Sequence, residues 1–290
     1  MAKGSLSASV AETARMLAAA GIENPRREAE LLVAAAAEAS REALLLHPER
    51  ELSPQAQEKL AALARLRSQR HPLAYVLGEK EFCALSFHTD PAAIVPRPET
   101  EILVEAAAAR AAACGASTAV DVGSGCGAIA VVLARSLPHL RVAALDLSPA
   151  ALRLARENCL RHGVADRVAL VCSDLLGGLR GRFDCIVANL PYVRRDEFPA
   201  LEPEVRDHEP RLALDGGRDG LQVIGRLAAQ VPEHLSQEGL VALEVGAGQA
   251  PRVAKLLGRR GLKQHEIIPD YAGLERVVVA WREGRPRWRT

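Results

Sequence analysis

Short apolar segments alternate with helical periodicities from about residue 99 onward, and this alternation constrains the fold more than any other feature of the sequence. It is typical of a parallel sheet with helices on both faces, which binds ligands beyond the carboxyl ends of its strands. We therefore predict an α/β domain over residues 99–290. Its candidate strands are 119–122, 141–145, 168–172, 185–188, 240–245, 265–268 and 277–281, and its candidate helices are 99–113, 127–137, 149–162, 220–236 and 249–260.

Residues 1–80 show helical periodicity only, and they predict a small helical bundle domain. Asn24 and Ser53 each precede a proline and are expected to cap the second and third helices. The second helix is expected to end with the leucines at 44–46, and the third to cover about 54–70. The segment 81–98 contains turn residues and three prolines, and we expect a hairpin followed by a stiff linker there.

The composition argues against several classes of function. The 37 basic and 36 acidic residues nearly cancel, whereas nucleic-acid binders usually carry a basic excess. The six cysteines form no CxxC pair, the histidines lack metal-ligand spacing, and no apolar run could span a membrane. We expect a reduced cytoplasmic monomer with no signal or transit peptide, no metal, no membrane contact and no specific nucleic-acid partner.

A glycine-rich loop, Asp121-Val-Gly-Ser-Gly-Cys-Gly127, follows the first strand and opens a helix. Glycines allow the tight turn and the close approach of a ligand to the backbone. Asp146 ends the second strand, where an acidic residue can accept both hydroxyls of a ribose. Together they indicate an adenosine-bearing cofactor, but a nicotinamide oxidoreductase also fits. A plain turn, with Asp146 as a helix cap, stays open as well. The candidate cofactor-binding residues of the loop are Gly123, Ser124, Gly125, Cys126 and Gly127.

The fourth strand ends in Asn189-Leu190-Pro191-Tyr192. The oxygen of the Asn189 side chain and the Leu190 carbonyl can accept the two N–H bonds of a planar amine, and Tyr192 offers it a flat face. Such a site would hold an sp² nitrogen while it attacks, which a nicotinamide enzyme does not need. A structural strand-ending turn is the alternative. We predict that residues 189–192 are catalytic and bind the substrate.

In this order, the motifs resemble those of class I S-adenosylmethionine-dependent methyltransferases that modify amide or amine nitrogens. More closely, the chain resembles the release factor glutamine methyltransferase family, also called PrmC or HemK. The likeness covers nearly the whole chain, and PRPET and EPRLALDGG are its most specific parts. It implies a Rossmann-like, mostly parallel seven-stranded sheet that follows the helical domain along the chain. The segments that carry it are 72–78 (PLAYVLG), 95–101 (VPRPETE), 121–130, 189–192 and 203–217 (PEVRDHEPRLALDGG).

The resemblance implies methylation of the glutamine amide nitrogen in the Gly-Gly-Gln motif of class I peptide chain release factors. It implies that S-adenosylmethionine binds at the glycine loop and Asp146, that Leu175 after Asp174 borders the adenine, and that Asn189 also lies beside the cofactor. Arg97 and Glu99 are expected near the substrate, and the helical domain is expected to dock it. One departure is Leu190, where the family normally has proline. Its carbonyl remains, and Pro191 keeps it extended.

Two further alternatives stay open. A DNA or RNA exocyclic-amine methyltransferase could use the same Asn-x-Pro-Tyr on a flipped base. The near-zero charge and the lack of a base-recognition domain argue against it. A non-enzymatic adaptor could keep the cofactor fold, but the intact Asn189 and Tyr192 argue against that reading.

Overall fold

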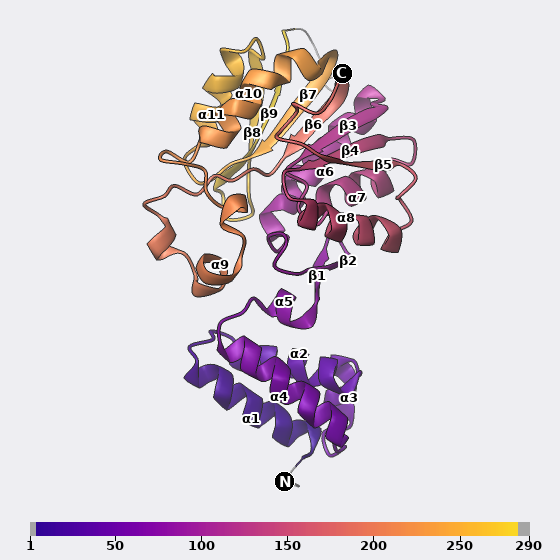
Figure 1. The fold of residues 1–290 in the computed structure, drawn as a ribbon, viewed down its shortest axis with the longest axis vertical. Helices are drawn as coiled ribbons and strands as arrows, with labels where there is room; N and C mark the ends of the chain where they lie inside the picture. The colour runs from indigo at the N-terminus through magenta and orange to yellow at the C-terminus, as the bar shows by residue number, and fades with distance from the viewer. Residues whose placement is uncertain (1–3, 284–290) are drawn as a thin grey trace. The chain divides into compact units, whose positions relative to one another are not determined.

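A computed structural model describes residues 4–283, and the chain divides into two units. The first unit contains residues up to 79 together with 202–208, and the second contains 80–201 and 209 onward. Figure 1 shows the ribbon, coloured along the chain. The outermost residues of the predicted domains, 1–3 and 284–290, lie outside this description. Within the described part, no helix is long and apolar enough to cross a membrane.

The first unit is a bundle of helices packed around a leucine-rich and alanine-rich core. Its largest helix contacts join α1 to α2 and α2 to α4, so that each helix buries the apolar stripe that its sequence predicts. The unit contains α1 (Leu6–Ala19), α2 (Pro25–Ala37), α3 (Arg41–Leu46), α4 (Pro54–Ser68), α5 (Leu73–Leu77) and α9 (Pro203–His208).

The prediction of one helix from Asn24 to Leu46 is wrong, because the chain turns in its middle. Glu38 adopts a left-handed conformation with φ of 51°, and this conformation ends α2. Ser40 then accepts a hydrogen bond from the Ala43 N–H and starts α3. Asn24 makes no side-chain cap bond, whereas Ser53 accepts from the Ala56 N–H as predicted.

A buried arginine ties a distant segment into the helical unit. Arg67, only 5% exposed, lies at the end of α4. Its guanidinium donates to Glu28 at 2.5 Å and to Glu204 at 2.9 Å, and Arg70 donates to the other oxygen of Glu204 at 2.7 Å. A guanidinium removed from water needs such partners, because an unpaired buried charge is costly. Glu204 lies in the first turn of α9, so the segment 203–217, which carries part of the family resemblance, is divided between the two units.

The second unit contains the predicted seven-stranded sheet, in the order β5-β4-β3-β6-β7-β9-β8. The pairs from β5 to β7 are parallel, and β9 is antiparallel to both of its neighbours. The predicted fold class is therefore confirmed. The strands are β3 (Thr118–Val122), β4 (Arg141–Asp146), β5 (Val168–Cys172), β6 (Phe183–Ala188), β7 (Leu235–Glu244), β8 (Gln264–Pro269) and β9 (Glu275–Trp281).

Helices cover both faces of this sheet, as Figure 1 shows. Alternate residues of each strand pack into one of two cores: Val187 faces the core beneath α6, α7 and α8, and Ile186 faces the core beneath α10 and α11. This period of two accounts for the near-continuous apolar strands in the sequence. The helices are α6 (Pro98–Cys114), α7 (Ala128–Ser136), α8 (Pro149–Arg161), α10 (Gln222–His234) and α11 (Ala250–Gly258), with 3-10 turns at Phe198–Ala200 and Arg211–Ala213.

The segment 81–98, expected as a hairpin and linker, belongs to the second unit. Strands β1 (Glu79–Phe82) and β2 (Leu85–His88) do form a hairpin. Phe82 and Phe87 are buried in the core beneath α6 to α8. The buried Asn158 of α8 also accepts from the His88 N–H at 2.7 Å and donates to the carbonyls of His88 and Cys126. The hairpin is therefore packed and hydrogen-bonded against the sheet's own helices.

Replacing Phe87 with alanine should remove a fully buried ring from this core. We expect the free energy of unfolding to fall by about 3–5 kcal/mol, the usual cost of emptying such a site. Chemical denaturation followed by circular dichroism measures it. The control is Tyr271→Ala, an aromatic side chain that is 92% exposed, for which we expect a change within about 0.5 kcal/mol. Equal losses would show that the hairpin contributes no core.

Candidate active site

The glycine-rich loop lies over the carboxyl end of β4. Gly123 and Ser124 both donate their N–H groups to the Leu145 carbonyl at 2.8 Å. Gly123 and Gly127 have φ of 75° and 83°, which disfavour other residues. A Cβ at Gly123 would lie 3.0 Å from the Leu190 side chain, so the loop directly contacts the Asn-Leu-Pro-Tyr segment. The positive φ values and this close contact with Leu190, rather than chain flexibility, require the glycines.

Asp121 braces this loop from below. Its carboxylate is fully buried, and Oδ2 accepts from the Ser124 hydroxyl at 2.7 Å and from the Ala130 N–H at 3.1 Å. Burial, together with the nearby Asp146, raises the pKa of Asp121 from 3.8 to about 7. The Ser124 hydroxyl therefore points at the base of the loop rather than into a cavity.

Asp146 connects the loop to the end of β4. Its Oδ2 accepts from the Gly125 N–H and its Oδ1 from the Ser148 N–H, both at 2.8 Å. The same carboxylate lines the cavity described below. Asp146 therefore supports the turn before α8 and also faces the cavity, and each oxygen keeps lone pairs for a further donor. Its role toward a ribose stays a prediction.

A cavity of about 190 Å³ lies at the carboxyl ends of β3, β4 and β6. Cys126, although in the loop, is buried beneath it, and burial raises the pKa of its thiol to about 12, so this thiol is no nucleophile. Eight predicted residues line the cavity: Gly123, Gly125, Asp146, Asp174, Leu175, Asn189, Leu190 and Pro191. Six do not: Ser124, Cys126, Gly127, Tyr192, Arg97 and Glu99.

Leu175 is held in the left-handed region with φ of 52°, although it is not glycine. Its side chain is buried and forms part of the cavity wall. Such backbone strain persists only where the surroundings impose it, and it concentrates at ligand sites. The preceding residue, Asp174, is also held, because Arg226 of α10 forms an ion pair with it.

Asn189 and Tyr192 are held by two residues that the sequence analysis did not connect to them. The Asn189 amide nitrogen donates to the Thr100 hydroxyl at 2.9 Å, and that hydroxyl donates to Glu244 Oε2 at 2.6 Å. The Tyr192 hydroxyl donates to Glu244 Oε1 over a longer 3.4 Å. Glu244 ends β7 and is 1% exposed. The only signal in the sequence was a carboxylate closing an apolar strand.

The segment after Asn189 is held by Gln249 and packs against Gly216 of EPRLALDGG and the nearby Gly220. Gln249 donates to the Tyr192 carbonyl at 3.0 Å. A Cβ at Gly220 would lie 2.4 Å from that same carbonyl, and one at Gly216 would lie 2.8 Å from the Tyr192 backbone. The glycines therefore allow the two segments to pack together.

Arg97 and Glu99 lie at the start of α6 and do not line the cavity. Arg97 donates to Glu209 at 2.6 Å, and this pair joins the start of α6 to the EPRLALDGG segment. Glu209 is buried, and burial raises its pKa even though Arg97 opposes the shift. Glu99 lies in the first turn of α6. A role for either residue toward the substrate stays a prediction.

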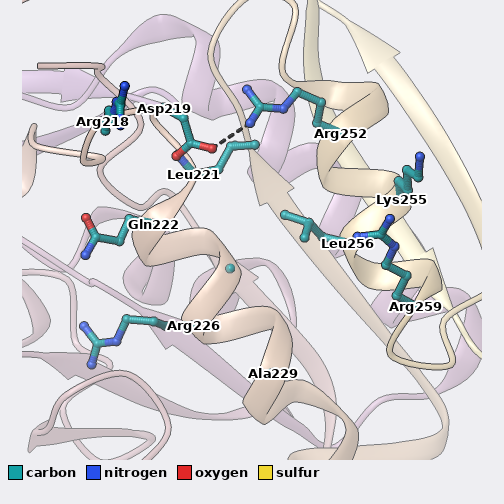
Figure 2. Close-up of a pocket in the computed structure, with 11 residues that line it drawn as sticks. Arg218, Asp219, Leu221, Gln222, Arg226, Ala229, Arg252, Lys255, Leu256 and Arg259 are labelled. Carbon is teal, nitrogen blue, oxygen red and sulfur yellow. Dashed lines mark hydrogen bonds and ion pairs between the residues drawn. The ribbon is translucent and has the colours of Figure 1, made fainter. Parts of the chain in front are cut away.

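A larger hollow of about 830 Å³ opens between α10 and α11 (Figure 2). Arginines and a lysine dominate its walls, and Asp219 faces Arg252 across it at 2.6 Å. None of the predicted site residues lines it, although Arg226, the ion-pair partner of Asp174, does, so its size does not make it the reaction site. Among residues 4–283, no group of three or more His, Cys, Asp or Glu side chains is placed to hold a metal ion.

Comparisons with known proteins agree with this arrangement. The PrmC N-terminal domain matches residues 9–78, and the methyltransferase small domain matches 98–216. A release factor glutamine methyltransferase of Moorella thermoacetica is 44% identical over 273 residues, covering 93% of this chain and 96% of that protein. Another, of Geobacter sulfurreducens, is 41% identical over 263 residues, covering 90% and 91%.

Solved structures share the fold at lower identity. A ribosomal protein L11 methylase of Lactobacillus delbrueckii subsp. bulgaricus has a TM-score of 0.50 at 23% identity, covering 67% of this chain and 84% of that one. The hMettl16 catalytic domain has a TM-score of 0.54 at 14% identity, covering 80% and 83%. At these identities the likeness concerns the fold alone.

The strand order, the glycine-rich loop and the Asn-x-Pro-Tyr segment beside it define a Rossmann-like methyltransferase. The identity and coverage of the relatives are more specific: the chain belongs to the release factor glutamine methyltransferase family. The resemblance seen in the sequence is thereby confirmed, and the oxidoreductase and nucleic-acid alternatives are not favoured.

The cavity fits the adenosine-bearing cofactor that this fold implies. Gly123 and Gly125 line it with backbone alone, Asp146 supplies the acidic acceptor, and Leu175 and Val223 supply apolar wall. The residues in place are therefore compatible with S-adenosylmethionine.

Asp121 should make the stability of this unit depend on pH. Its pKa is raised on folding, so the folded chain keeps a proton that the unfolded chain has released. This stabilisation is complete below pH 3.8 and is lost as the pH rises to about 7. Asp121→Asn removes the titration and keeps an oxygen for Ser124 and Ala130. Between pH 5 and 8, the parent should lose on the order of a few kcal/mol relative to this variant.

Chemical denaturation of both proteins at several pH values measures this difference. If the free energy of unfolding of the parent and that of Asp121→Asn change with pH in parallel, the raised pKa of Asp121 is contradicted. Tyr271→Ala, which changes a 92% exposed side chain and no carboxylate, serves as the control that should follow the parent at every pH.

Proposed function

We propose that this chain transfers a methyl group from S-adenosylmethionine to the side-chain amide nitrogen of the glutamine in the Gly-Gly-Gln motif of class I peptide chain release factors. The fixed orientation of the Asn189 amide carries the proposal. Its nitrogen donates to Thr100, and within residues 4–283 its oxygen has no hydrogen-bond partner. The Leu190 carbonyl also accepts no hydrogen bond from the described residues. Two neighbouring acceptors match the two N–H bonds of a primary amide.

The cofactor would lie in the cavity between the glycine loop and Asn189. We assign the ribose to Asp146, the backbone contacts to Gly123 and Gly125, and the adenine border to Asp174 and Leu175, all of which line this cavity. When bound, S-adenosylmethionine supplies a methyl group activated by its sulfonium. Ser124, Cys126 and Gly127 support the loop from outside the cavity.

The chain's own contribution is orientation of the nucleophile. An amide nitrogen is a poor nucleophile because its lone pair is delocalised into the carbonyl. By accepting both N–H bonds, Asn189 and Leu190 would point that nitrogen in one direction and favour its pyramidal form. Alignment of reacting groups by itself accounts for a large part of many enzymatic accelerations. Tyr192, whose pKa is raised by burial and by Glu244, stays a neutral phenol beside this pair.

The helical unit would dock the release factor, since it holds none of the site residues. Two leucines of α3, Leu45 and Leu46, are each 73% exposed. Exposed apolar side chains at neighbouring positions suit a contact with a protein partner. A cytoplasmic monomer that binds no specific nucleic acid stays a prediction from the sequence.

Co-expression of a class I release factor with this chain, followed by mass spectrometry of its Gly-Gly-Gln peptide, tests the proposed function. The peptide should gain the mass of one methyl group. Asn189→Ala should lower kcat by about 10²–10³-fold, as loss of one preorganised polar contact does elsewhere. Calorimetry should show S-adenosylmethionine binding that is largely intact.

Leu190→Pro is the matched control, because it keeps the carbonyl and the extended backbone, and we expect a mild effect. If Asn189→Ala keeps near-normal turnover, the Asn-Leu-Pro-Tyr segment is a structural turn. If the parent leaves the peptide unmethylated, the substrate assignment is wrong.

Replacing Leu45 and Leu46 with serine should raise KM for the intact release factor and leave KM for a short Gly-Gly-Gln peptide unchanged. The reason is that only the intact protein can reach the helical unit. Steady-state kinetics measures the KM of the variant and of the parent for both substrates. Leu274→Ser, at a 47% exposed leucine of the second unit, is the control. Equal changes in KM on both substrates would contradict docking through α3.

A further inference from the structure

Glu244, Thr100 and Asn189 come from three distant parts of the chain and meet in one hydrogen-bonded line. Thr100 lies in the first turn of α6, Asn189 follows β6, and Glu244 ends β7. Thr100 is 5% exposed and Glu244 is 1% exposed, so water cannot take over their bonds. A buried carboxylate at the end of an apolar strand is costly, and this one has only hydroxyl partners and no salt bridge within residues 4–283.

The direction of each bond follows from the inventory of donors. A hydroxyl has one proton, and at 2.6 Å the Thr100 proton must point at an ionised Glu244. Thr100 can then only accept from Asn189, and only the nitrogen of the Asn189 amide can donate. A flipped amide would place the Asn189 oxygen against the Thr100 oxygen at 2.9 Å with no proton between them, because the Thr100 proton points at Glu244. The line therefore selects the amide orientation in which Oδ1 is free.

We propose that Glu244 and Thr100 are positioning residues which, through their hydrogen-bonded line, keep the oxygen of Asn189 facing the substrate nitrogen. The inference rests on the proposed function, because the free Asn189 oxygen is the acceptor assigned there. Neither residue touches the substrate. Their effect is to prevent the Asn189 amide from presenting its NH₂ group to another NH₂ group.

Protonation of Glu244 would release this selection. A protonated carboxyl can donate to Thr100, which can then donate to a flipped Asn189. Desolvation raises the pKa of Glu244 to about 7, and the neighbouring Glu99 of α6 adds to the shift. Thr100, Tyr192 and Arg276 of β9 oppose it. The rate should therefore fall as the pH decreases below about 7.

The experiment compares Thr100→Val, Thr100→Ser and Glu244→Gln in the full chain, with a Gly-Gly-Gln peptide as substrate. Thr100→Val removes the hydroxyl at nearly constant shape. The kcat should fall about 10-fold to 100-fold, the loss typical when a group that orients a metal-binding side chain is removed. The S-adenosylmethionine Kd should not change. Thr100→Ser keeps the hydroxyl and should retain most of the parent kcat.

Glu244→Gln gives a second readout that a structural role would not change. Glutamine can present either its oxygen or its NH₂ group to Thr100, so both orientations of Asn189 become available. The variant should have a lower kcat at pH 8 and should lack the decline in rate below pH 7. Asp121→Asn, which removes a different buried carboxylate with a raised pKa, should keep that decline.

The outcomes separate the two proposals. If the parent methylates the peptide and Thr100→Val has the same kcat, the positioning role alone is overturned. The same holds if Thr100→Ser is as slow as Thr100→Val. An acid limb that persists in Glu244→Gln would also overturn it. A parent that methylates neither the peptide nor the release factor would overturn the proposed function and this inference with it.

Discussion

The parallel pairing of β3 with β4 on one side and β6 on the other is the constraint on which the site depends. In parallel strands the carboxyl ends lie at the same edge, and β3 is where the strand order reverses direction. The glycine loop, Asp146 and Asn189 each follow one of these three strands. Their meeting at a single cavity is therefore a consequence of strand pairing, although 68 residues separate Asp121 from Asn189.

Two buried carboxylates hold the loops at that edge in defined positions. Asp121 supports the glycine loop through Ser124 and Ala130, and Glu244 supports the Asn-Leu-Pro-Tyr segment through Thr100 and, over a longer distance, Tyr192. Both have raised pKa values because the apolar core disfavours their charge. Burial of these two carboxylates in the core that stabilises the sheet therefore costs free energy of folding. In return, bonds to a buried acceptor have a fixed direction, which surface bonds exchanging with water lack.

Much of the fold followed from patterns local to the chain. All seven strands and the helices of the second unit agree with the periodicity, because buried strands and amphipathic helices leave strong signals. Predictions failed where local signals were ambiguous. Glu38 ends α2 in a left-handed conformation that its type does not suggest. The prolines and turn residues of 81–98 indicated a linker, yet Phe82 and Phe87 fill the core under α6 to α8.

The sequence by itself determined the order of the strands along the chain, the motifs that follow them and the resemblance to one family. It could not reveal that Glu244, which looks like the charged end of a strand, lies under Asn189, or that Arg97 pairs with Glu209. The hydrogen bonds that make these contacts join residues 89 to 144 positions apart. Whether such hydrogen bonds form depends on differences of a few tenths of an ångström in the donor–acceptor distance. Only the packing of α6 against β6 and β7 sets these distances.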